Sequence, residues 1–466
     1  MSHGTVYLVG AGPGDTELIT LKGFRLLARA DVVLFDHLSS PGLLQFKKPS
    51  AELIPVGKFA SKHTLPQESI NRLLVEKAKE GKMVVRLKGG DCCLFGRGGE
   101  EAEACVEAGV EFEIVPGVTS ALAAPCYAGI PPTHRDCASN VAIVTGHRKT
   151  GDKRPVEIPK ADTIVFLMSV GNISNIVSSL ISKGFAKNER IAAVEHGTCY
   201  DQRVITGTLG NFLEIAERAK LRTPAIFIVG KVVQLREKLD WFAGKPNVLV
   251  LGNHPEKYEH LGNIVHRRII DCVPVDDFAE VDKVLKKISD FDWIVFTSVN
   301  GVKYLFSRLN NQNMDARNLA SVKIAAIGKT TAAGLTEYGI IADLVPENES
   351  SAGLLDEFAG LDMSGRKILL PQARVSSKEL PRGLLEMNAL VERAVVYRTV
   401  DIEPGNIDFD YIDCILFTSG STVRAFAKRF KEVPPGVKVY ALGLPTLNEA
   451  KKHNIIGEIM PPGPAD

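Results

Sequence analysis

The segment that most constrains the fold is the glycine-rich stretch 86–101, which directly follows the apolar pair Val84-Val85. Gly89-Gly90 fall where a strand would end, and glycine lets a ligand approach the backbone because it has no Cβ. Asp91 places a carboxylate acceptor at the same turn, and a helical pattern follows. A plain connector between a strand and a helix does not need so many glycines. We interpret the segment as a binding loop, with a glycine-rich turn that holds no ligand as the alternative.

Length and composition indicate a large globular protein. At 466 residues the chain is long for one domain, and about three or four domains are expected. The 56 Lys and Arg residues balance the 55 Asp and Glu residues, so no basic excess indicates nucleic-acid binding. The first residues do not form a signal peptide, and no run reaches the roughly eighteen apolar residues of a membrane span. We therefore expect a cytoplasmic protein that binds neither nucleic acid nor membrane.

The eight cysteines are scattered among apolar segments and form no C-x-x-C pair. A metal site needs ligands that are clustered at short spacing. We therefore expect reduced, partly buried thiols and no metal site.

The first apolar strand leads into Gly10-Ala-Gly-Pro-Gly-Asp15, which is similar to a dinucleotide-binding fingerprint. Asp36, which follows the apolar run 32–35, matches the acidic residue that would hold a ribose. Two features weaken this interpretation, because Asp15 stands where Gly or Ala is needed and Pro13 lacks an amide for the pyrophosphate. An acidic turn favours a ligand with positive charge. NAD is therefore the minor alternative.

Strand and helix patterns alternate through the first half of the chain. Helices are expected over 18–30 and 67–80, and strands over 6–9, 32–35, 112–115, 141–145, 163–168, 190–195 and 225–229. Strands that alternate with helices indicate parallel sheets. The strand series that starts at Val141 indicates a second unit, so two α/β units, about 1–120 and 125–240, share this half.

A set of motifs occurs in order between about residues 4 and 240. They are Val9-Gly-Ala-Gly-Pro-Gly-Asp, Ala30-Asp-Val-Val-Leu-Phe-Asp, Val56-Gly-Lys, Arg86-Leu-Lys-Gly-Gly-Asp with Phe95-Gly-Arg-Gly, Val115-Pro-Gly-Val-Thr-Ser, Gly129-Ile-Pro-Pro-Thr-His-Arg, Thr145-Gly-His and Pro224-Ala-Ile-Phe-Ile-Val-Gly. Together they resemble the uroporphyrinogen-III C-methyltransferases of the tetrapyrrole methylase family. The resemblance implies S-adenosylmethionine as the cofactor, bound between the two units, and a homodimer formed through this half.

The resemblance also implies roles for individual residues. It places the cofactor near Pro13, Gly89, Gly90, Asp91, Leu94, Thr119, Ser120, Met168, Gly197 and Ala225. It makes Asp36 a proton acceptor and Lys58 a proton donor, where their residue types alone favour a strand-end cap and a solvated surface charge. The family usually has Pro-Phe after Gly-Gly-Asp, whereas Cys92-Cys93 stand here. The smaller residues are expected to loosen the loop and to affect cofactor affinity more than activity.

These residue types suit methylation of a tetrapyrrole. A sulfonium methyl is a strong electrophile, so the enzyme mainly aligns it with an electron-rich carbon and needs no metal. The macrocycle must then lose a proton and rearrange its double bonds, which needs a carboxylate and an amine. The eight carboxylates of the substrate need cationic partners. The candidates are Arg97, His134, Arg135, His147 and Arg148.

The second half contains an internal repeat after a linker expected at 241–247. Residues 296–308 align with 417–429, and residues 322–331 align with 437–446. The repeat predicts two similar α/β lobes. In both lobes a strand ends just before a helix whose first hydroxyls and amides could bind an anion, and plain helix N-caps are the alternative. The candidate residues are Thr297, Ser298, Thr330, Thr331, Thr418 and Ser419.

The Phe-Thr-Ser segments, Ile327-Gly-Lys-Thr-Thr-Ala and Val396-Tyr-Arg-Thr399 make residues 248–466 similar to uroporphyrinogen-III synthase. This resemblance implies interwoven lobes, one from about 248–272 with 401–466 and the other from 273–400. It places Tyr397 near the leaving hydroxyl of hydroxymethylbilane, with a half-buried strand residue as the alternative. Gly443-Leu-Pro-Thr446 departs from the family's Gly-x-Thr-Thr, which puts the carboxylate contacts of the second lobe in doubt.

The sequence therefore predicts an α/β protein with a two-unit tetrapyrrole methylase fold followed by a two-lobed, duplicated α/β synthase fold. We expect it to close hydroxymethylbilane to uroporphyrinogen III and to methylate that product twice, giving precorrin-2 for sirohaem or cobalamin synthesis. No third dinucleotide segment remains, so NAD and ferrochelation should be absent. The alternatives are a methylase that acts on a later corrin intermediate and a second half that binds porphyrinogen without catalysis.

Overall fold

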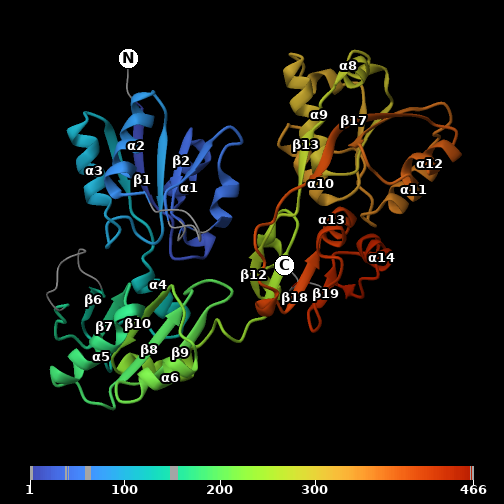
Figure 1. Cartoon of the computed structure of the whole chain (residues 1–466). Coiled ribbons are helices and arrows are strands. Elements are labelled where there is room, and N and C mark those ends of the chain that lie inside the picture. Colours follow the sequence, from blue (N-terminus) through green and yellow to red (C-terminus); the bar gives the residue numbers. More distant parts are fainter. Residues whose placement is uncertain are drawn as a thin grey trace.

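The computed structural model describes residues 4–36, 39, 41–57, 65–146, 156–461 and 463. This part of the chain forms four five-stranded sheets, with helices packed against them (Figure 1). The predicted α/β class is confirmed. None of the helices within these ranges is both long enough and apolar enough to cross a membrane.

The first sheet is entirely parallel, with the order β3-β2-β4-β1-β5. Its strands are β1 (Thr5–Gly10), β2 (Val32–Phe35), β3 (Glu52–Pro55), β4 (Val84–Lys88) and β5 (Glu111–Val115), and its helices are α1 (Leu21–Arg29), α2 (Gln67–Lys79) and α3 (Gly98–Glu107). Helix α1 begins three residues later than predicted, because the Thr20 side chain caps it by accepting from the Gly23 amide at 3.1 Å. The carboxyl ends of β1, β2 and β4 share one edge, which brings their loops together.

The second sheet is mixed, with the order β6-β7-β10-β8-β9. Its strands are β6 (Val141–Thr145), β7 (Thr163–Leu167), β8 (Arg190–Glu195), β9 (Arg203–Thr208) and β10 (Ala225–Val229), and its helices are α4 (Ser120–Tyr127), α5 (Ile173–Ser182), α6 (Phe212–Arg218) and α7 (Arg236–Leu239). Only β6 and β7 pair in parallel, so the prediction of a parallel sheet is wrong here. The connection 196–202 between β8 and β9 is too short for a parallel crossover.

The second half forms two sheets whose strands come from interleaved parts of the chain. One sheet contains β11 (Asn247–Val250), β12 (Asn263–His266), β18 (Cys414–Phe417), β19 (Lys438–Ala441) and β20 (Glu458–Ile459). The other contains β13 (Ile270–Pro274), β14 (Trp293–Phe296), β15 (Lys323–Ala326), β16 (Lys367–Ala373) and β17 (Leu390–Asp401). The chain leaves the first of these lobes after β12 and returns to it after β17.

The internal repeat has the same structure in both lobes. The helices of this half are α8 (Ala279–Leu285), α9 (Val299–Asn311), α10 (Lys329–Thr336), α11 (Ser351–Ala359), α12 (Glu379–Glu386), α13 (Gly420–Phe430) and α14 (Leu444–Lys452). β14 leads into α9 and β15 into α10, just as β18 leads into α13 and β19 into α14. In each lobe the two repeat strands are parallel neighbours. The predicted duplication is confirmed.

Short 3-10 helices complete the chain. They are η1 (Thr16–Leu18), η2 (Pro41–Phe46), η3 (Val170–Asn172), η4 (Lys231–Leu235), η5 (Pro255–Leu261), η6 (Ile288–Asp290), η7 (Ala316–Leu319) and η8 (Phe409–Tyr411). Residues of η1, η2, η3 and η5 line the cavity that is described below.

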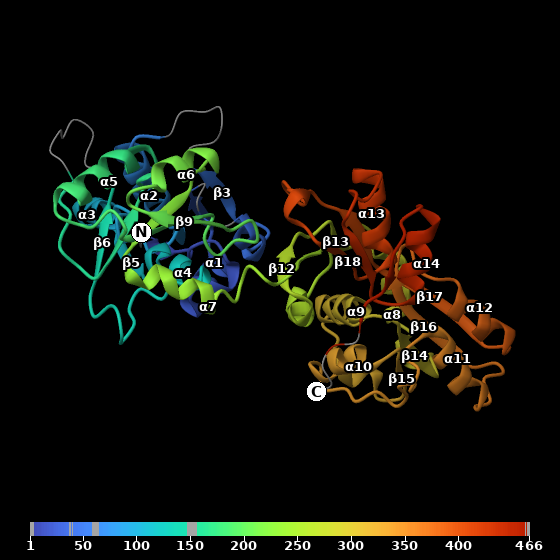
Figure 2. The ribbon, with the colours of Figure 1, turned by 90° about the horizontal axis from the view of Figure 1, so that it is seen from below.

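The two halves touch near the segment that joins them, and β12 lies on the side of the second half that faces the first (Figure 2). Trp241 and Phe242 pack on Tyr127 of α4, with ring centroids 4.9 and 5.1 Å away. The Asn247 side chain donates to the Tyr200 carbonyl at 2.9 Å, and Arg222 donates to the Tyr411 hydroxyl at 2.7 Å. The start of the predicted linker is therefore docked on the first half.

Candidate functional site

A cavity of about 2250 Å³ runs from the carboxyl edge of the first sheet to the start of α9. Both units of the first half line it, and so do residues of η5, β12 and α9 in the second half. All the residues expected around the cofactor lie along it, namely Pro13, Gly89, Gly90, Asp91, Leu94, Thr119, Ser120, Met168, Gly197 and Ala225. Segments that are far apart in the sequence therefore meet around one space.

The glycine loop after β4 is held against the loop after β1. Gly90 has a φ of 69°, which favours glycine, and its amide donates to the Gly12 carbonyl at 2.7 Å. The Gly12 amide returns a bond to the Gly90 carbonyl at 3.2 Å. A Cβ on Gly117 would lie 2.3 Å from the Gly90 carbonyl oxygen. Three loops therefore approach one another more closely than side chains would allow.

Asp91 folds this loop with its carboxylate. One oxygen accepts from the amides of Cys93 and Leu94 at 2.8 and 3.0 Å, and the other accepts from the Gly117 amide at 3.0 Å. Cys92 is fully buried beneath the loop, and burial raises the pKa of its thiol to about 12. The ligand atoms of Asp91, Cys92 and Cys93 lie within 4.8 Å of one another. An engaged carboxylate and a protonated thiol suit a folded loop better than a metal site.

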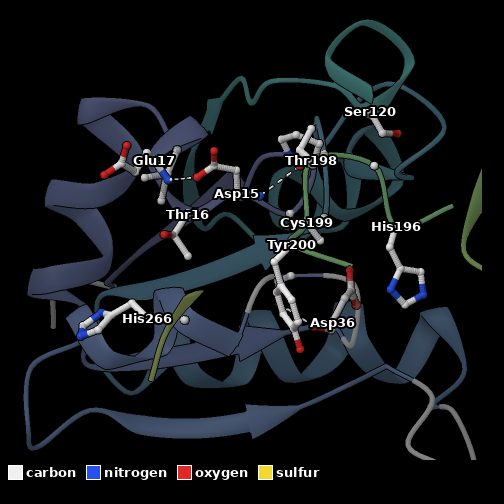
Figure 3. A pocket seen from close by; sticks show the side chains of 18 of the residues that line it. Asp15, Thr16, Glu17, Asp36, Ser120, His196, Thr198, Cys199, Tyr200 and His266 are labelled. Carbon is white, nitrogen blue, oxygen red and sulfur yellow. Dashed lines mark hydrogen bonds between the residues drawn. The ribbon is translucent and has the colours of Figure 1, made fainter. Parts of the chain in front are cut away.

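The acidic turn at Asp15 ties the two units of the first half together across the cavity (Figure 3). Its carboxylate accepts from the Glu17 amide at 2.9 Å and from the Tyr127 hydroxyl at 2.8 Å. Its amide donates to the Thr198 hydroxyl at 3.0 Å. Burial, together with the hydrogen bond between Tyr127 and the Asp15 carboxylate, raises the pKa of Tyr127. These three bonds hold Asp15 in a fixed position beside the cavity.

Asp36 faces the cavity at the end of a buried chain of charges. Arg86 donates to the Asp36 carboxylate at 2.7 Å and to Glu101 at 3.0 Å, and Lys88 donates to the same Glu101 oxygen at 2.8 Å. Arg86, Lys88 and Glu101 are 2%, 3% and 0% exposed, whereas the Asp36 side chain is 29% exposed. Burial and the neighbouring Arg86 lower the pKa of Lys88. This chain holds Asp36 in place.

Sequence reasoning missed Arg86, Lys88 and Glu101. The signal was present, because two charged residues alternate with apolar ones in a strand whose residues are all buried. A buried charge needs a partner, which Glu101 supplies from α3.

The turn between β8 and β9 forms another wall of the cavity. His196 Nδ1 lies 2.6 Å from a carboxylate oxygen of Asp201, and this bond raises the pKa of His196. A Cβ on Gly197 would lie 2.2 Å from the Cβ of Ala124 on α4. The turn is thus fixed at close range against the small-residue helix.

The cations expected to bind substrate are not all at the cavity. Arg97 lines it and donates to Glu100 at 2.9 Å. His134 and Arg135 are not among its lining residues. Lys58, His147 and Arg148 lie outside the described residues.

Tyr397 lies in β17 of the second half, where its side chain contacts residues of α9 and its N-cap, and it is not among the residues that line the cavity. It is 8% exposed, its hydroxyl lies 3.1 Å from the Ser298 hydroxyl, and its ring stacks on Tyr304 with centroids 5.4 Å apart. Burial raises the pKa of Tyr397, so the phenol is neutral at neutral pH. Tyr304, which sequence reasoning missed, also lines the cavity and donates to the Cys272 carbonyl.

Two of the six hydroxyl residues proposed as anion ligands in the second half cap helices with their side chains. Ser298 accepts from the Gly301 amide at 3.1 Å, and Ser419 accepts from the Thr422 amide at 3.3 Å. Thr331 is 4% exposed and Thr330 is exposed. The residues of this group do not line the cavity, namely Thr297, Ser298, Thr330, Thr331, Thr418 and Ser419.

Comparison with known proteins separates the two halves. Residues 5–213 match the family model of the tetrapyrrole (corrin/porphyrin) methylases, and residues 257–465 match that of uroporphyrinogen-III synthase HemD. The chain is 39% identical to the porphyrin biosynthesis protein HemD of Ruminiclostridium josui, across 98% of this chain and 95% of that protein.

Two further relatives each match about half of this chain. A uroporphyrinogen-III C-methyltransferase of Priestia megaterium is 49% identical over 49% of this chain and 98% of that protein. An S-adenosyl-L-methionine-dependent uroporphyrinogen III methyltransferase of Methanosarcina barkeri is 49% identical over 51% of this chain and 95% of that protein.

Proposed function

Because the chain belongs to the tetrapyrrole methylase family in its first half and to the uroporphyrinogen-III synthase family in its second, we propose that one polypeptide catalyses two consecutive reactions. The second half closes hydroxymethylbilane to uroporphyrinogen III. The first half methylates that product with S-adenosylmethionine, twice, to give precorrin-2 for sirohaem or cobalamin synthesis. A homodimer through the first half is part of this proposal, and light scattering tests it.

The observation that carries the proposal is the gathering of the cofactor candidates around one cavity. Gly89 and Gly90 offer backbone without a Cβ, and Asp15 and Asp91 are acidic residues at the same edge. A sulfonium cofactor carries positive charge, which suits this edge better than a pyrophosphate does. The relative from Methanosarcina barkeri is named for its dependence on this cofactor.

Methyl transfer needs alignment and a place for a proton. S-adenosylmethionine supplies an electrophilic methyl group, which the loops hold toward the macrocycle. Asp36 accepts the proton that the macrocycle releases after methylation, and Arg86, 2.7 Å away, fixes the position of this carboxylate. Lys58 is proposed to return a proton when the double bonds rearrange.

Ring closure needs the bilane to be folded and its terminal hydroxyl to leave. The neutral phenol of Tyr397, paired with Ser298 at 3.1 Å, is proposed to donate a hydrogen bond to that hydroxyl. Ser298 and Ser419 each accept from one amide at the starts of α9 and α13. The other amides of these first turns are proposed to bind carboxylates of the substrate.

Two assays on the intact chain test the proposal. With uroporphyrinogen III and S-adenosylmethionine, the mass of the product should rise by two methyl groups. Absence of this product, with methylation of a later corrin intermediate instead, would overturn the assignment of the first half. With hydroxymethylbilane alone, the chain should give isomer III. Isomer I, which forms spontaneously, would show that the second half binds porphyrinogen without catalysis.

A further inference from the structure

The cavity extends from the proposed methyl-transfer site to the first turns of α9, next to the proposed synthase site. At one end it is lined by Gly89, Gly90 and Asp36, and at the other by Asn300, Lys303 and Tyr304. Tyr304 stacks directly on Tyr397. A cavity of about 2250 Å³ exceeds the roughly 300–1,000 Å³ of a typical ligand pocket. It therefore has room for a macrocycle as well as a cofactor.

Most cations along this cavity already have a carboxylate partner within 4.0 Å. These cations are Arg86, Lys88, Arg97, His196, His254 and Arg268. Among the lysines and arginines of the described residues, Lys245, Arg267 and Lys303 line the cavity without such a partner. All three belong to the linker or the second half.

These three cations contact aromatic rings, and Arg267 also contacts a backbone oxygen. The Arg267 guanidinium lies 5.9 Å from the ring centroid of Tyr200 and donates to the His266 carbonyl at 2.9 Å. Lys245 lies 5.0 Å from the Trp241 ring, and Lys303 lies 5.7 Å from the Tyr304 ring. Each ammonium or guanidinium keeps donors for a ligand.

Arg267 lies where the second half contacts the first half. It follows β12, and its partner Tyr200 lies in the turn that carries Gly197 and Thr198. Figure 3 shows His266, the residue before Arg267, in the same view as Asp36 and Tyr200. A cation from the second half thus stands beside the methyl-transfer cleft of the first.

We propose that Arg267 and Lys303, assisted by Lys245, form a carboxylate-binding site along which the tetrapyrrole made in the second half passes to the first without release. The inference rests on the proposed function. A polycarboxylate supplies the charge partners that these cations lack, through charge-assisted hydrogen bonds. Lys303 stands at the synthase end, and Arg267 stands at the methyltransferase end.

The wall of the cavity also carries acidic residues. Glu17, Glu256 and Glu259 also line the cavity. Burial and the charges of Glu259, Asp15 and Glu256 raise the pKa of Glu17, so these carboxylates are close enough to repel one another. These glutamates repel a ligand rich in carboxylates, which leaves the cations of the wall as its binding partners.

An isotope competition on the intact chain tests the inference. The chain receives ¹³C-labelled hydroxymethylbilane, S-adenosylmethionine and an excess of unlabelled uroporphyrinogen III. Direct passage predicts that early methylated product carries a ¹³C fraction several-fold above that of the free uroporphyrinogen III. Raised salt should lower this fraction, because it screens the cations. An equal fraction in product and free pool for the unmodified chain would overturn the inference.

A charge-reversal pair identifies the residues. Arg267→Glu with Lys303→Glu should lower the product's ¹³C fraction to that of the pool, and Arg267→Ala with Lys303→Ala should lower it in part. The matched control, Lys378→Glu with Arg382→Glu, changes exposed cations at α12 away from the cavity. Equal fractions in all variants would exclude these residues. If added uroporphyrinogen III is not methylated at all, the proposed function fails instead.

Discussion

At the scale of single residues, the first half depends on buried charges that satisfy one another. Asp36, Arg86, Glu101 and Lys88 form one connected chain from the cavity into α3. Removing each charge from water costs free energy, and the attraction of its partner offsets that cost. Loss of one partner therefore leaves the remaining buried charges to destabilise the fold. The position of Asp36 at a strand end could be read from the sequence. The partners could not, because they are brought together only by the packing of α3 on the sheet.

Glu101→Gln tests this chain of charges. The change leaves Arg86 and Lys88 buried without their shared counter-charge, and we expect a loss of about 3–5 kcal/mol in the free energy of unfolding. Methylation of added uroporphyrinogen III should fall as well, because Glu101 no longer fixes the Arg86 side chain that positions Asp36. Chemical denaturation and product mass measure the two effects. Glu103→Gln, on the exposed side of the same helix, is the control. Equal stability of the two variants would contradict the account.

The His196–Asp201 pair predicts a pH dependence. Asp201 raises the pKa of His196 above its ordinary value of 6.5. The protonated form is therefore favoured in the folded state, and its stabilisation is present below pH 6.5 and lost as pH rises through the raised pKa. The melting temperature of the unmodified chain relative to Asp201→Asn should accordingly decrease across that window. A difference that stays constant with pH would show that the pair does not couple to folding.

Tyr397→Phe separates the two activities. The variant keeps the stacked ring and loses only the hydroxyl beside Ser298, so we expect formation of isomer III to slow by about tenfold or more. Methylation of added uroporphyrinogen III should not change. Tyr440→Phe, in the other lobe, is the matched control. A Tyr397→Phe variant that closes the bilane at the normal rate would remove this residue from the mechanism.

At the scale of elements, apolar runs predicted most strands of the first half to within one or two residues. The edge strand β9, whose Arg203 and Thr208 ends are polar, carried no such signal. The sequence also did not predict the strand order of the second sheet, because β10 lies antiparallel between β7 and β8. In the second half the repeat predicted the paired strand–helix units, since both copies keep the capping serine before the helix.

Because the three loops approach one another closely, a single methyl group added at Gly117 should displace them. A Cβ on Gly117 would meet the Gly90 carbonyl oxygen at 2.3 Å, and both are backbone positions that cannot rotate away. Gly117→Ala should therefore push the glycine loop from β1 and weaken binding of S-adenosylhomocysteine, measured by calorimetry. Gly99→Ala, where a Cβ meets nothing within 4 Å, should bind normally and gain up to about 1 kcal/mol of stability. Equal affinity in the two variants would argue against a cofactor held by this loop.

At the scale of the whole molecule, the sequence separated the two halves at the linker. It did not reveal that Trp241 and Phe242 dock on Tyr127, or that β12 reaches the first half. Contacts between domains depend on surfaces with no periodic signal, and here they involve single residues such as Arg222 and Asn247. The consequence of these contacts is one cavity that residues of both halves line.

The measurement that tests the central claim most directly is a calorimetric titration of the intact chain with S-adenosylhomocysteine and, separately, with NAD. The account predicts that S-adenosylhomocysteine binds one site per chain in competition with S-adenosylmethionine, and that NAD produces no binding heat. Binding of NAD together with indifference to S-adenosylhomocysteine would contradict it.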